Sequence, residues 1–245
     1  MHQFEIVRYV PIEIGGVDIS FTNSSLWMCL VAVAASLFLT LSVSSRRLVP
    51  TRMQSVAELT YEFIADMVRS ITGNDGLRFF PFVFALFVFI LFANMFGMIP
   101  YSFTVTSHII VTFALAALVF AIVLIVGFAR HGLRFFALFA PDVSPVMLPL
   151  LVPIEIISFL SRPMSLSVRL FANMLAGHTM LKVFAGFVVG LGGAGGAFAV
   201  LSVAPLAAIV AFSALEILVA FLQAYVFAIL TCIYLNEALH LHDHH

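Results

Sequence analysis

Long stretches without a charged residue constrain the fold of this chain more than any other feature of its sequence. They extend over residues 19–45, 79–129, 183–215 and 217–236. A helix that spans a bilayer needs about 20 mostly apolar residues, and each stretch is long enough. Only 9% of the 245 residues are charged, whereas soluble domains have about 25%. We therefore predict a polytopic membrane protein and exclude a soluble fold.

The remaining composition excludes other classes. A formal net charge of −1, without runs of like charge, excludes nucleic acid as a partner. Cys29 and Cys232 lie in apolar stretches at a spacing typical of neither metal ligands nor paired cysteines, so we interpret them as small buried residues. The charged residues before residue 19 do not follow the order of a cleaved signal peptide, so residues 19–45 are expected to contain a retained first span.

The expected fold class is all-α, with about five membrane-embedded helices, the last two forming a long tilted hairpin, plus one interfacial amphipathic helix. The amphipathic helix is indicated by apolar residues at helical spacing with acidic residues between them, and the hairpin by a glycine-rich reversal at residues 192–196. The single membrane domain divides into an outer N-terminal segment (1–25), a first span (26–45), the interfacial helix (53–71), two spans (79–129), the functional helical hairpin (143–236) and an inner tail (237–245).

Basic residues indicate the orientation. Arg46 and Arg47 follow the first span, and Arg130 and Arg134 follow the third, whereas the loop between the second and third spans has no arginine. Because inner loops are enriched in Lys and Arg, we expect an outer N-terminus and a C-terminus on the cytoplasmic or matrix side.

Ionisable residues interrupt the first arm of the hairpin. Glu155, Arg162 and Arg169 follow one another at intervals of seven residues, with Asn173 one turn later, so they form one polar stripe on a helix. His178 lies nine residues after Arg169, which places it on the opposite face. Charges within a membrane span are costly and usually functional.

The second arm offers a partner for His178. Glu216 and Gln223 are seven residues apart and share a face that can oppose His178. A membrane-embedded histidine and carboxylate are suited to relaying protons, because histidine titrates near neutrality and burial moves a carboxyl group towards it. Arg169 instead acts as a fixed charge, since a guanidinium stays protonated.

Structural interpretations stay open for several of these residues. Arg162 and Lys182 can extend to a membrane interface, and Glu155 can be a structural partner of Arg162. An ion pair between Arg169 and Glu216 would leave His178 unexplained. We interpret His108 as an interface residue, and the tail with His240, His242, His244 and His245 as solvated despite its resemblance to a weak metal-binding tract.

Three segments, in this order along the chain, resemble subunit a of the F-type ATP synthases. They read NMFGMIP at residues 94–100, SLSVRLFANMLAGH at residues 165–178, and LEI at 215–217 followed by QAYVF at 223–227. The resemblance covers most of the chain and is weakest over residues 1–26. It implies a proton-translocating stator subunit of the membrane sector, which couples proton flow to rotation of a ring of c subunits.

The resemblance also implies residue roles. Arg169 matches the stator arginine that faces the ring carboxylates and keeps two aqueous half-channels apart. The resemblance implies three groups: the outer half-channel with His178, Glu216, Asn173, Gln223 and Asn94; the inward path with Glu155; and the c-ring interface with Arg169, Asn173 and Arg162. In some family members the acidic residue and the histidine of the relay pair exchange positions. Some members also have an acidic residue at the position of Gly97, and any role of that acidic group is absent in this chain.

The implied partners are the c-subunit ring, b-type peripheral stalk subunits, the rest of the F1Fo complex and membrane lipid. No catalytic residue, cofactor or metal is expected, because nucleotide chemistry needs a phosphate-binding loop that this sequence lacks. The expected location is an energy-transducing inner membrane, bacterial or alternatively mitochondrial, and the expected ion is the proton.

Two other functions remain open from the residues alone. A secondary transporter would use Arg169 to bind an anionic substrate and residues 192–196 as a hinge, but the inverted repeats typical of such proteins are not found. A membrane scaffold would use its charges only in structural pairs, so that removing both members of a pair would be tolerated.

Overall fold

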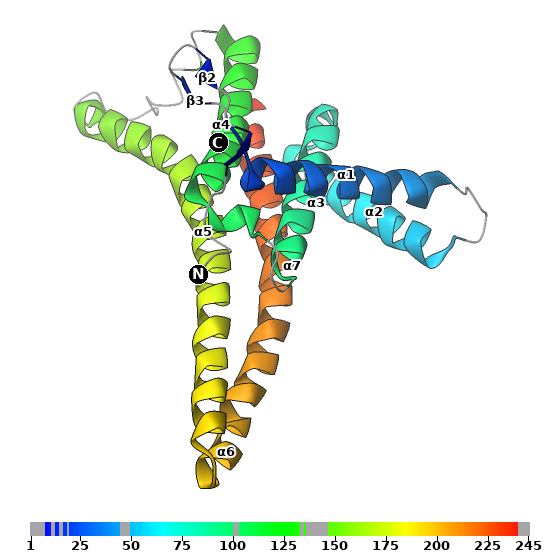
Figure 1. The fold of residues 1–245 in the computed structure, drawn as a ribbon. Helices are drawn as coiled ribbons and strands as arrows, with labels where there is room; N and C mark the ends of the chain where they lie inside the picture. Colours follow the sequence, from blue (N-terminus) through cyan, green and yellow to red (C-terminus); the bar gives the residue numbers. More distant parts are fainter. Residues whose placement is uncertain are drawn as a thin grey trace.

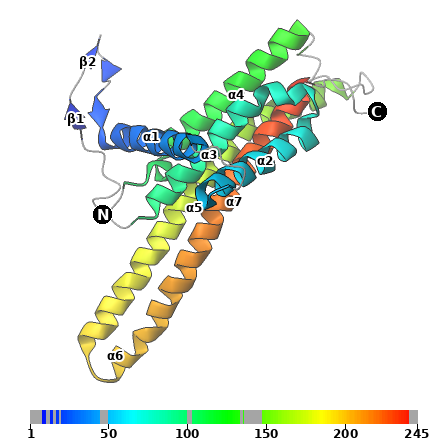
Figure 2. The same cartoon turned by 90° about the vertical axis from the view of Figure 1, so that its right-hand side faces the viewer.

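Two long antiparallel helices form the frame of the molecule. The structure is a computed structural model and describes residues 8–10, 13–14, 17–18, 20–44, 50–99, 103–132, 135 and 147–239. The helices α5 (Leu148–Ala194) and α7 (Val203–Leu239) run side by side, and the other long helices pack around one end of this pair (Figure 1). The other end extends beyond them and is closed by the short helix α6 (Ala197–Leu201) (Figure 2).

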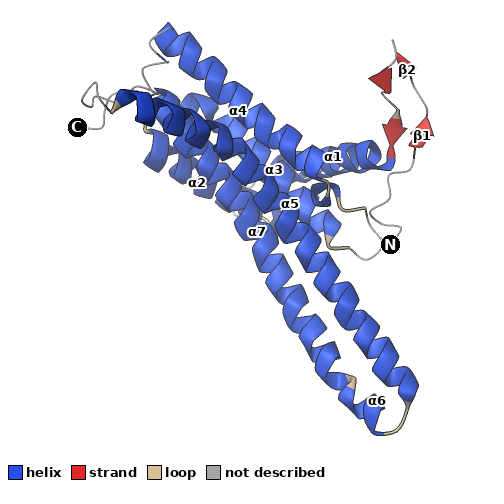
Figure 3. Ribbon diagram, turned by 90° about the vertical axis from the view of Figure 1, so that its left-hand side faces the viewer, coloured by secondary structure: helices blue, strands red, loops and turns tan. Residues whose placement is uncertain are grey.

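The N-terminal part contains a feature that the sequence did not predict. Two short antiparallel pairs join β1 (Arg8–Val10) with β4 (Phe21–Thr22) and β2 (Glu13–Ile14) with β3 (Val17–Asp18). Figure 3 shows these strands ahead of α1 (Asn23–Ser44), apart from the helical bundle. The helices form the described bundle, so the prediction of an all-α membrane protein is confirmed for it.

The amphipathic helix α2 (Arg52–Thr72) has defined ends. The hydroxyl of Thr51 accepts a hydrogen bond from the backbone N–H of Gln54, and Gly73 ends the helix with a φ of 64°, a conformation that glycine adopts without strain. Ala57, Ile64, Met67 and Val68 are buried, while the acidic residues between them are exposed. A helix therefore covers the expected range 53–71, and its position at the membrane interface stays a prediction.

A buried loop connects the next two spans. After the 3-10 helix η2 (Asp75–Phe79), α3 (Phe80–Gly97) begins with a proline in its first turn, and α4 (Ile109–His131) follows the 3-10 helix η3 (Val105–Ser107). Residues 103–107 are buried, and η3 packs against α5, α3 and α4. The polar loop that divides the two spans thus lies inside the bundle.

The first arm of the hairpin is not straight. Pro153 and Pro163 lie inside α5, where each removes a backbone hydrogen bond and bends the helix, and α5 changes direction near its beginning (Figure 1). At its other end, Gly195 and Gly196 adopt φ values of 69° and 58°. These glycines make the reversal that the sequence indicated at residues 192–196.

Small side chains on α7 let the neighbouring helices approach closely. Ala220, Ala224 and Ala228 recur every fourth residue and are each 0% exposed. Small residues at this spacing are typical of helix contacts in membranes. Since α7 packs against α2, α3, α4 and α5, this helix is the centre of the core.

Five helices in the described part are long and apolar enough to cross a membrane, in agreement with the prediction of a multi-pass protein. They are residues 23–44, 75–97, 109–131, 149–194 and 198–239. The basic residues Arg46, Arg47 and Arg134, Pro100 and the histidine-rich tail lie outside the described residues.

Phe87 tests the packing of this core. Its side chain is 0% exposed and makes an edge contact with Phe221 at a centroid distance of 6.0 Å. Phe87→Ala is expected to lower the free energy of unfolding by about 3 kcal/mol, because it leaves a cavity. Phe113→Ala, at a side chain that is 50% exposed, is the control and should cost less. The apparent unfolding temperature in detergent is measured for both variants. Equal losses of stability in the two variants would contradict the buried position of Phe87.

Candidate functional site

Polar side chains gather inside the bundle where α5, α7 and the buried loop meet. Burying an unpaired polar group in apolar surroundings is costly, so such a group indicates either a hydrogen-bonded structure or a function. The buried polar residues of this region are Asn94, Thr104, Thr106, Ser107, Thr112, Ser167, His178, Glu216 and Gln223.

His178 is the centre of this cluster. Its Nδ1 lies 3.6 Å from Oε1 of Glu216 on α7, and its Nε2 lies 3.1 Å from the hydroxyl of Thr104 in the buried loop. The side chains of His178 and Glu216 are only 8% and 5% exposed. The expected meeting of these two residues is therefore observed, whereas their role in proton movement stays a prediction.

Two glycines make room for this arrangement. A Cβ atom on Gly177 would lie 2.6 Å from Oε1 of Glu216, and one on Gly97 would lie 2.7 Å from Cγ2 of Thr104. A side chain at either position would therefore force Glu216 or Thr104 to shift. The glycines thus allow α5 and α3 to approach the residues around His178.

Amides line the next part of the cluster. Asn173 Nδ2 donates a 2.9 Å hydrogen bond to Oε1 of Gln223, which joins α5 to α7. Asn94 Nδ2 donates to the backbone oxygen of Ala220 at 3.2 Å, which joins α3 to α7. The amides predicted on the two arms of the hairpin therefore contact each other. Asn94, from α3, contacts the same segment of α7.

Arg169 has a different environment. It is exposed, as is Asn173 one turn later, while Leu170 and Met174 beside them are 0% exposed. The predicted contrast between Arg169 and the buried His178 is thus present. In the described part of the chain, the ion-pair contact of Glu216 is with His178 and not with Arg169.

Arg162 has a partner that the sequence analysis did not consider. Its guanidinium forms an ion pair with Glu237 near the end of α7 and lies over the rings of Phe159 and Tyr234, 5.6 and 5.3 Å from their centroids. Glu155, which we considered as a partner of Arg162, is half-buried earlier on α5. Pro163 lies inside α5 between Arg162 and Arg169, so the straight helix assumed for the stripe does not hold here.

His108 lies just before α4 and stacks on Phe103, with the ring centroids 4.8 Å apart. Burial lowers the pKa of His108 below its ordinary value, because the charged imidazolium loses hydration. The positive end of the α4 dipole also disfavours a cation at this position. Both effects favour the neutral form of His108, and its position at a membrane interface stays a prediction.

The residues that sequence reasoning missed are Thr104, Gly177 and Glu237. The hydroxyl-rich stretch before residue 108 was a usable signal, but it was interpreted only as a break between two spans. No local pattern indicates that Thr104 contacts a histidine 74 residues away.

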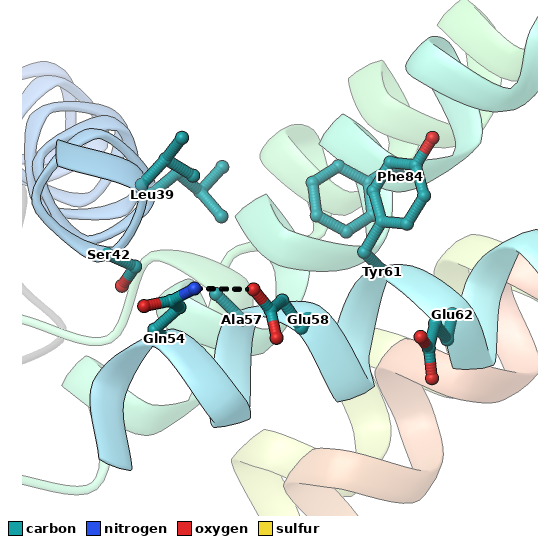
Figure 4. Close-up of a pocket in the computed structure, with 9 residues that line it drawn as sticks. Leu39, Ser42, Gln54, Ala57, Glu58, Tyr61, Glu62 and Phe84 are labelled. Atoms are coloured by element: carbon teal, nitrogen blue, oxygen red, sulfur yellow. Dashed lines mark hydrogen bonds between the residues drawn. The ribbon is translucent and has the colours of Figure 1, made fainter. Parts of the chain in front are cut away.

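A separate hollow of about 540 Å³ lies between α1, α2 and α3. Figure 4 shows Tyr61 and Phe84 on one side of it, Leu39 on another, and a hydrogen bond between Gln54 and Glu58. None of the residues expected to carry function lines this hollow. This hollow is therefore separate from the polar cluster around His178.

Gly177 offers a test of the packing around Glu216. Gly177→Ala is expected to lower the apparent unfolding temperature, because the new methyl group would displace the Glu216 carboxylate. Gly186→Ala on the same helix is the matched control, since an added Cβ there meets no atom within 4 Å. Alanine favours helix over glycine by about 1 kcal/mol, so the control should keep or raise stability. A stabilised Gly177→Ala protein would contradict the described packing.

The pair of Arg162 and Glu237 offers a second test. Their side chains are 22% and 31% exposed, so Arg162→Met should leave a largely buried carboxylate and cost about 2 kcal/mol of unfolding free energy. Adding Glu237→Leu should recover most of this loss. Arg130→Met, in an ion pair whose side chains are 42% and 54% exposed, should change stability by less than about 1 kcal/mol. Thermal unfolding is measured for Arg162→Met, for the double variant and for Arg130→Met. A double variant less stable than Arg162→Met would contradict the ion pair between Arg162 and Glu237.

Comparison with known proteins agrees with the resemblance. Residues 25–236 match the sequence profile of the family described as ATP synthase A chain. The chain is 64% identical over 241 residues to ATP synthase subunit a of Chelativorans sp. (strain BNC1), covering 98% of this chain and 97% of that protein. It is 61% identical to ATP synthase subunit a of Mesorhizobium japonicum over 241 residues, and 62% identical to that of Agrobacterium fabrum over 240 residues, covering 98% of this chain and 96% of each relative. The chain therefore belongs to the ATP synthase A chain family, the membrane-sector subunits that take part in proton translocation.

Proposed function

We propose that this chain is the stator subunit that provides two offset half-channels to a rotating c-ring and couples proton flow to rotation. The observation that carries the proposal is the contrast along α5. Arg169 is exposed, whereas His178, nine residues later, is buried beside Glu216 of α7. One helix thus presents a permanent positive charge outwards and a pair of titratable groups inwards.

The inlet half-channel runs past His178 and Glu216, with Asn173, Gln223 and Asn94 beside them. Support comes from polar atoms that are buried without a hydrogen-bond partner in the described part of the chain: Oδ1 of Asn94, Nε2 of Gln223 and Oε1 of Glu216. Such atoms offer binding sites for water, and protons move readily along water and titratable side chains.

The second half-channel leads inwards and includes Glu155. Along α5, Arg169 lies between Glu155 and His178. Because a guanidinium stays protonated, Arg169 does not pass protons from one path to the other. Arg169 and Asn173 are exposed, which supports a contact with the c-ring, while Arg162 serves this interface by holding α5 against α7 through Glu237.

Rotation follows from the separation of the two paths. A ring carboxylate that receives a proton from the inlet becomes neutral and can enter lipid, while the next carboxylate releases its proton to the inward path and is attracted to Arg169. Each charge that crosses 100 mV contributes about 2.3 kcal/mol. Proton flow therefore gives a direction to thermal motion of the ring.

The chain acts as a non-catalytic part of the complex, with nucleotide chemistry on other subunits. Its direct partners are the c-subunit ring and b-type peripheral stalk subunits. The relatives compared above come from bacteria, which supports the bacterial inner membrane as its location. The arginine-rich segments after the first and third spans support an outer N-terminus and a cytoplasmic C-terminus.

Removal of the Arg169 charge tests this function. In vesicles that carry the whole complex, Arg169→Ala is expected to abolish proton-driven ATP synthesis and to let protons leak through the membrane sector. ATP synthesis and passive proton conduction are measured together, and the amount of assembled complex is checked by gel. Arg130→Ala, which also removes an exposed arginine, should keep synthesis near the unaltered rate. Normal synthesis by the Arg169→Ala complex would exclude the stator role.

A further inference from the structure

We propose that Thr104 is a positioning residue that fixes which nitrogen of His178 carries the hydrogen, and thereby makes the contact between Nδ1 and Glu216 the one that exchanges protons. This inference rests on the proposed function, because it describes how one step of the inlet path works. It concerns a buried loop residue on neither arm of the hairpin.

The hydrogen bonds of Thr104 carry the argument. A threonine hydroxyl has one hydrogen to donate and lone pairs to accept. Thr104 Oγ1 donates to the backbone oxygen of Gly97 at 3.2 Å, and that oxygen has no hydrogen to give in return. The 3.1 Å contact between Thr104 Oγ1 and Nε2 of His178 must then be an N–H of the imidazole donating to the hydroxyl.

This assignment determines the state of the other ring nitrogen. With Nε2 protonated, a neutral His178 presents the lone pair of Nδ1 towards Oε1 of Glu216, 3.6 Å away. A shift of a few tenths of an ångström brings the two atoms into hydrogen-bond range. The O–H bond of a protonated Glu216 then breaks as an N–H bond forms at Nδ1, giving imidazolium and carboxylate with no net change in protons or charge. The reverse transfer returns the proton to Glu216.

The surroundings keep Thr104 in place. It is 0% exposed, and Gly97 packs so closely against it that a side chain there would meet Cγ2 of Thr104 at 2.7 Å. In the described part of the chain, the charged or titratable groups beside His178 are Glu216 from α7 and Lys182. Lys182 lies one turn later on α5 and acts on the imidazole electrostatically. The contact with the neutral Thr104 hydroxyl is the one that selects the His178 tautomer with hydrogen on Nε2.

The test replaces one hydroxyl at a time in the whole complex, reconstituted in vesicles. Thr104→Val keeps the shape of the side chain but removes the acceptor of the His178 hydrogen. Thr106→Val is the matched control, because Thr106 is equally buried, lies two residues away and, among the described residues, its hydroxyl has no hydrogen-bond partner. Thr104→Ser keeps the hydroxyl and should restore the unaltered behaviour.

Two measurements are made. Thr104→Val is expected to slow ATP-driven proton pumping about fivefold, as for the loss of one hydrogen bond that orders a reacting group. Nitrogen NMR of complexes with isotope-labelled histidine reports the second effect, with the His178 signal identified by its absence in a His178→Gln complex. The unaltered, Thr106→Val and Thr104→Ser complexes should show hydrogen on Nε2 of neutral His178, and Thr104→Val should show a mixture of both tautomers.

A Glu216→Gln complex separates the two levels of the proposal. If Glu216→Gln stops pumping while Thr104→Val matches Thr106→Val in rate and tautomer, the role of Thr104 is wrong and the proposed function stands. If Glu216→Gln pumps normally, the proposed inlet path itself is wrong. A slowed Thr104→Val complex with an unchanged His178 tautomer would reduce Thr104 to a packing residue and overturn the inference.

Discussion

Polar groups inside this bundle have to find partners within the protein, because lipid offers none. The cost of an unpaired polar group in apolar surroundings explains where the described polar side chains lie. Arg162 bonds to Glu237, Asn173 to Gln223 and Asn94 to a backbone oxygen of α7. All three contacts end on α7, so the polar residues and the close packing of small residues on that helix hold the same elements together.

The same constraint gives α5 its two faces. Between Arg169 and His178, the helix carries two ionisable groups of different kinds. The Arg169 guanidinium is always charged, whereas the His178 imidazole can lose its charge. Arg169 is exposed, whereas His178 is buried against Glu216 and Thr104. Separation of the two by nine residues on an α-helix is enough to give them different surroundings. The spacing therefore links a local property of the sequence to the proposed division between rotor contact and proton path.

Helix positions, the hairpin and the meeting of His178 with Glu216 were predictable, because hydrophobic periodicity and the cost of intramembrane charge act locally. The bend of α5 was missed, since the periodicity of Glu155, Arg162 and Arg169 was extended through Pro163 as if the helix were straight. The contact of His178 with Thr104 and the contact of Arg162 with Glu237 were missed for another reason. Thr104 lies in a loop, and Glu237 lies in what was expected to be a tail, so no repeat in the sequence connects either residue with α5.

Gly97 lets the buried loop pack closely against α3. Here Cγ2 of Thr104 would lie 2.7 Å from any Cβ at position 97, and the hydroxyl of Thr104 uses the backbone oxygen of Gly97 as its acceptor. A side chain at position 97 would therefore require Thr104 to shift from this position. In this chain a polar contact to His178 comes from the loop, and the glycine on α3 leaves room for the loop beside it.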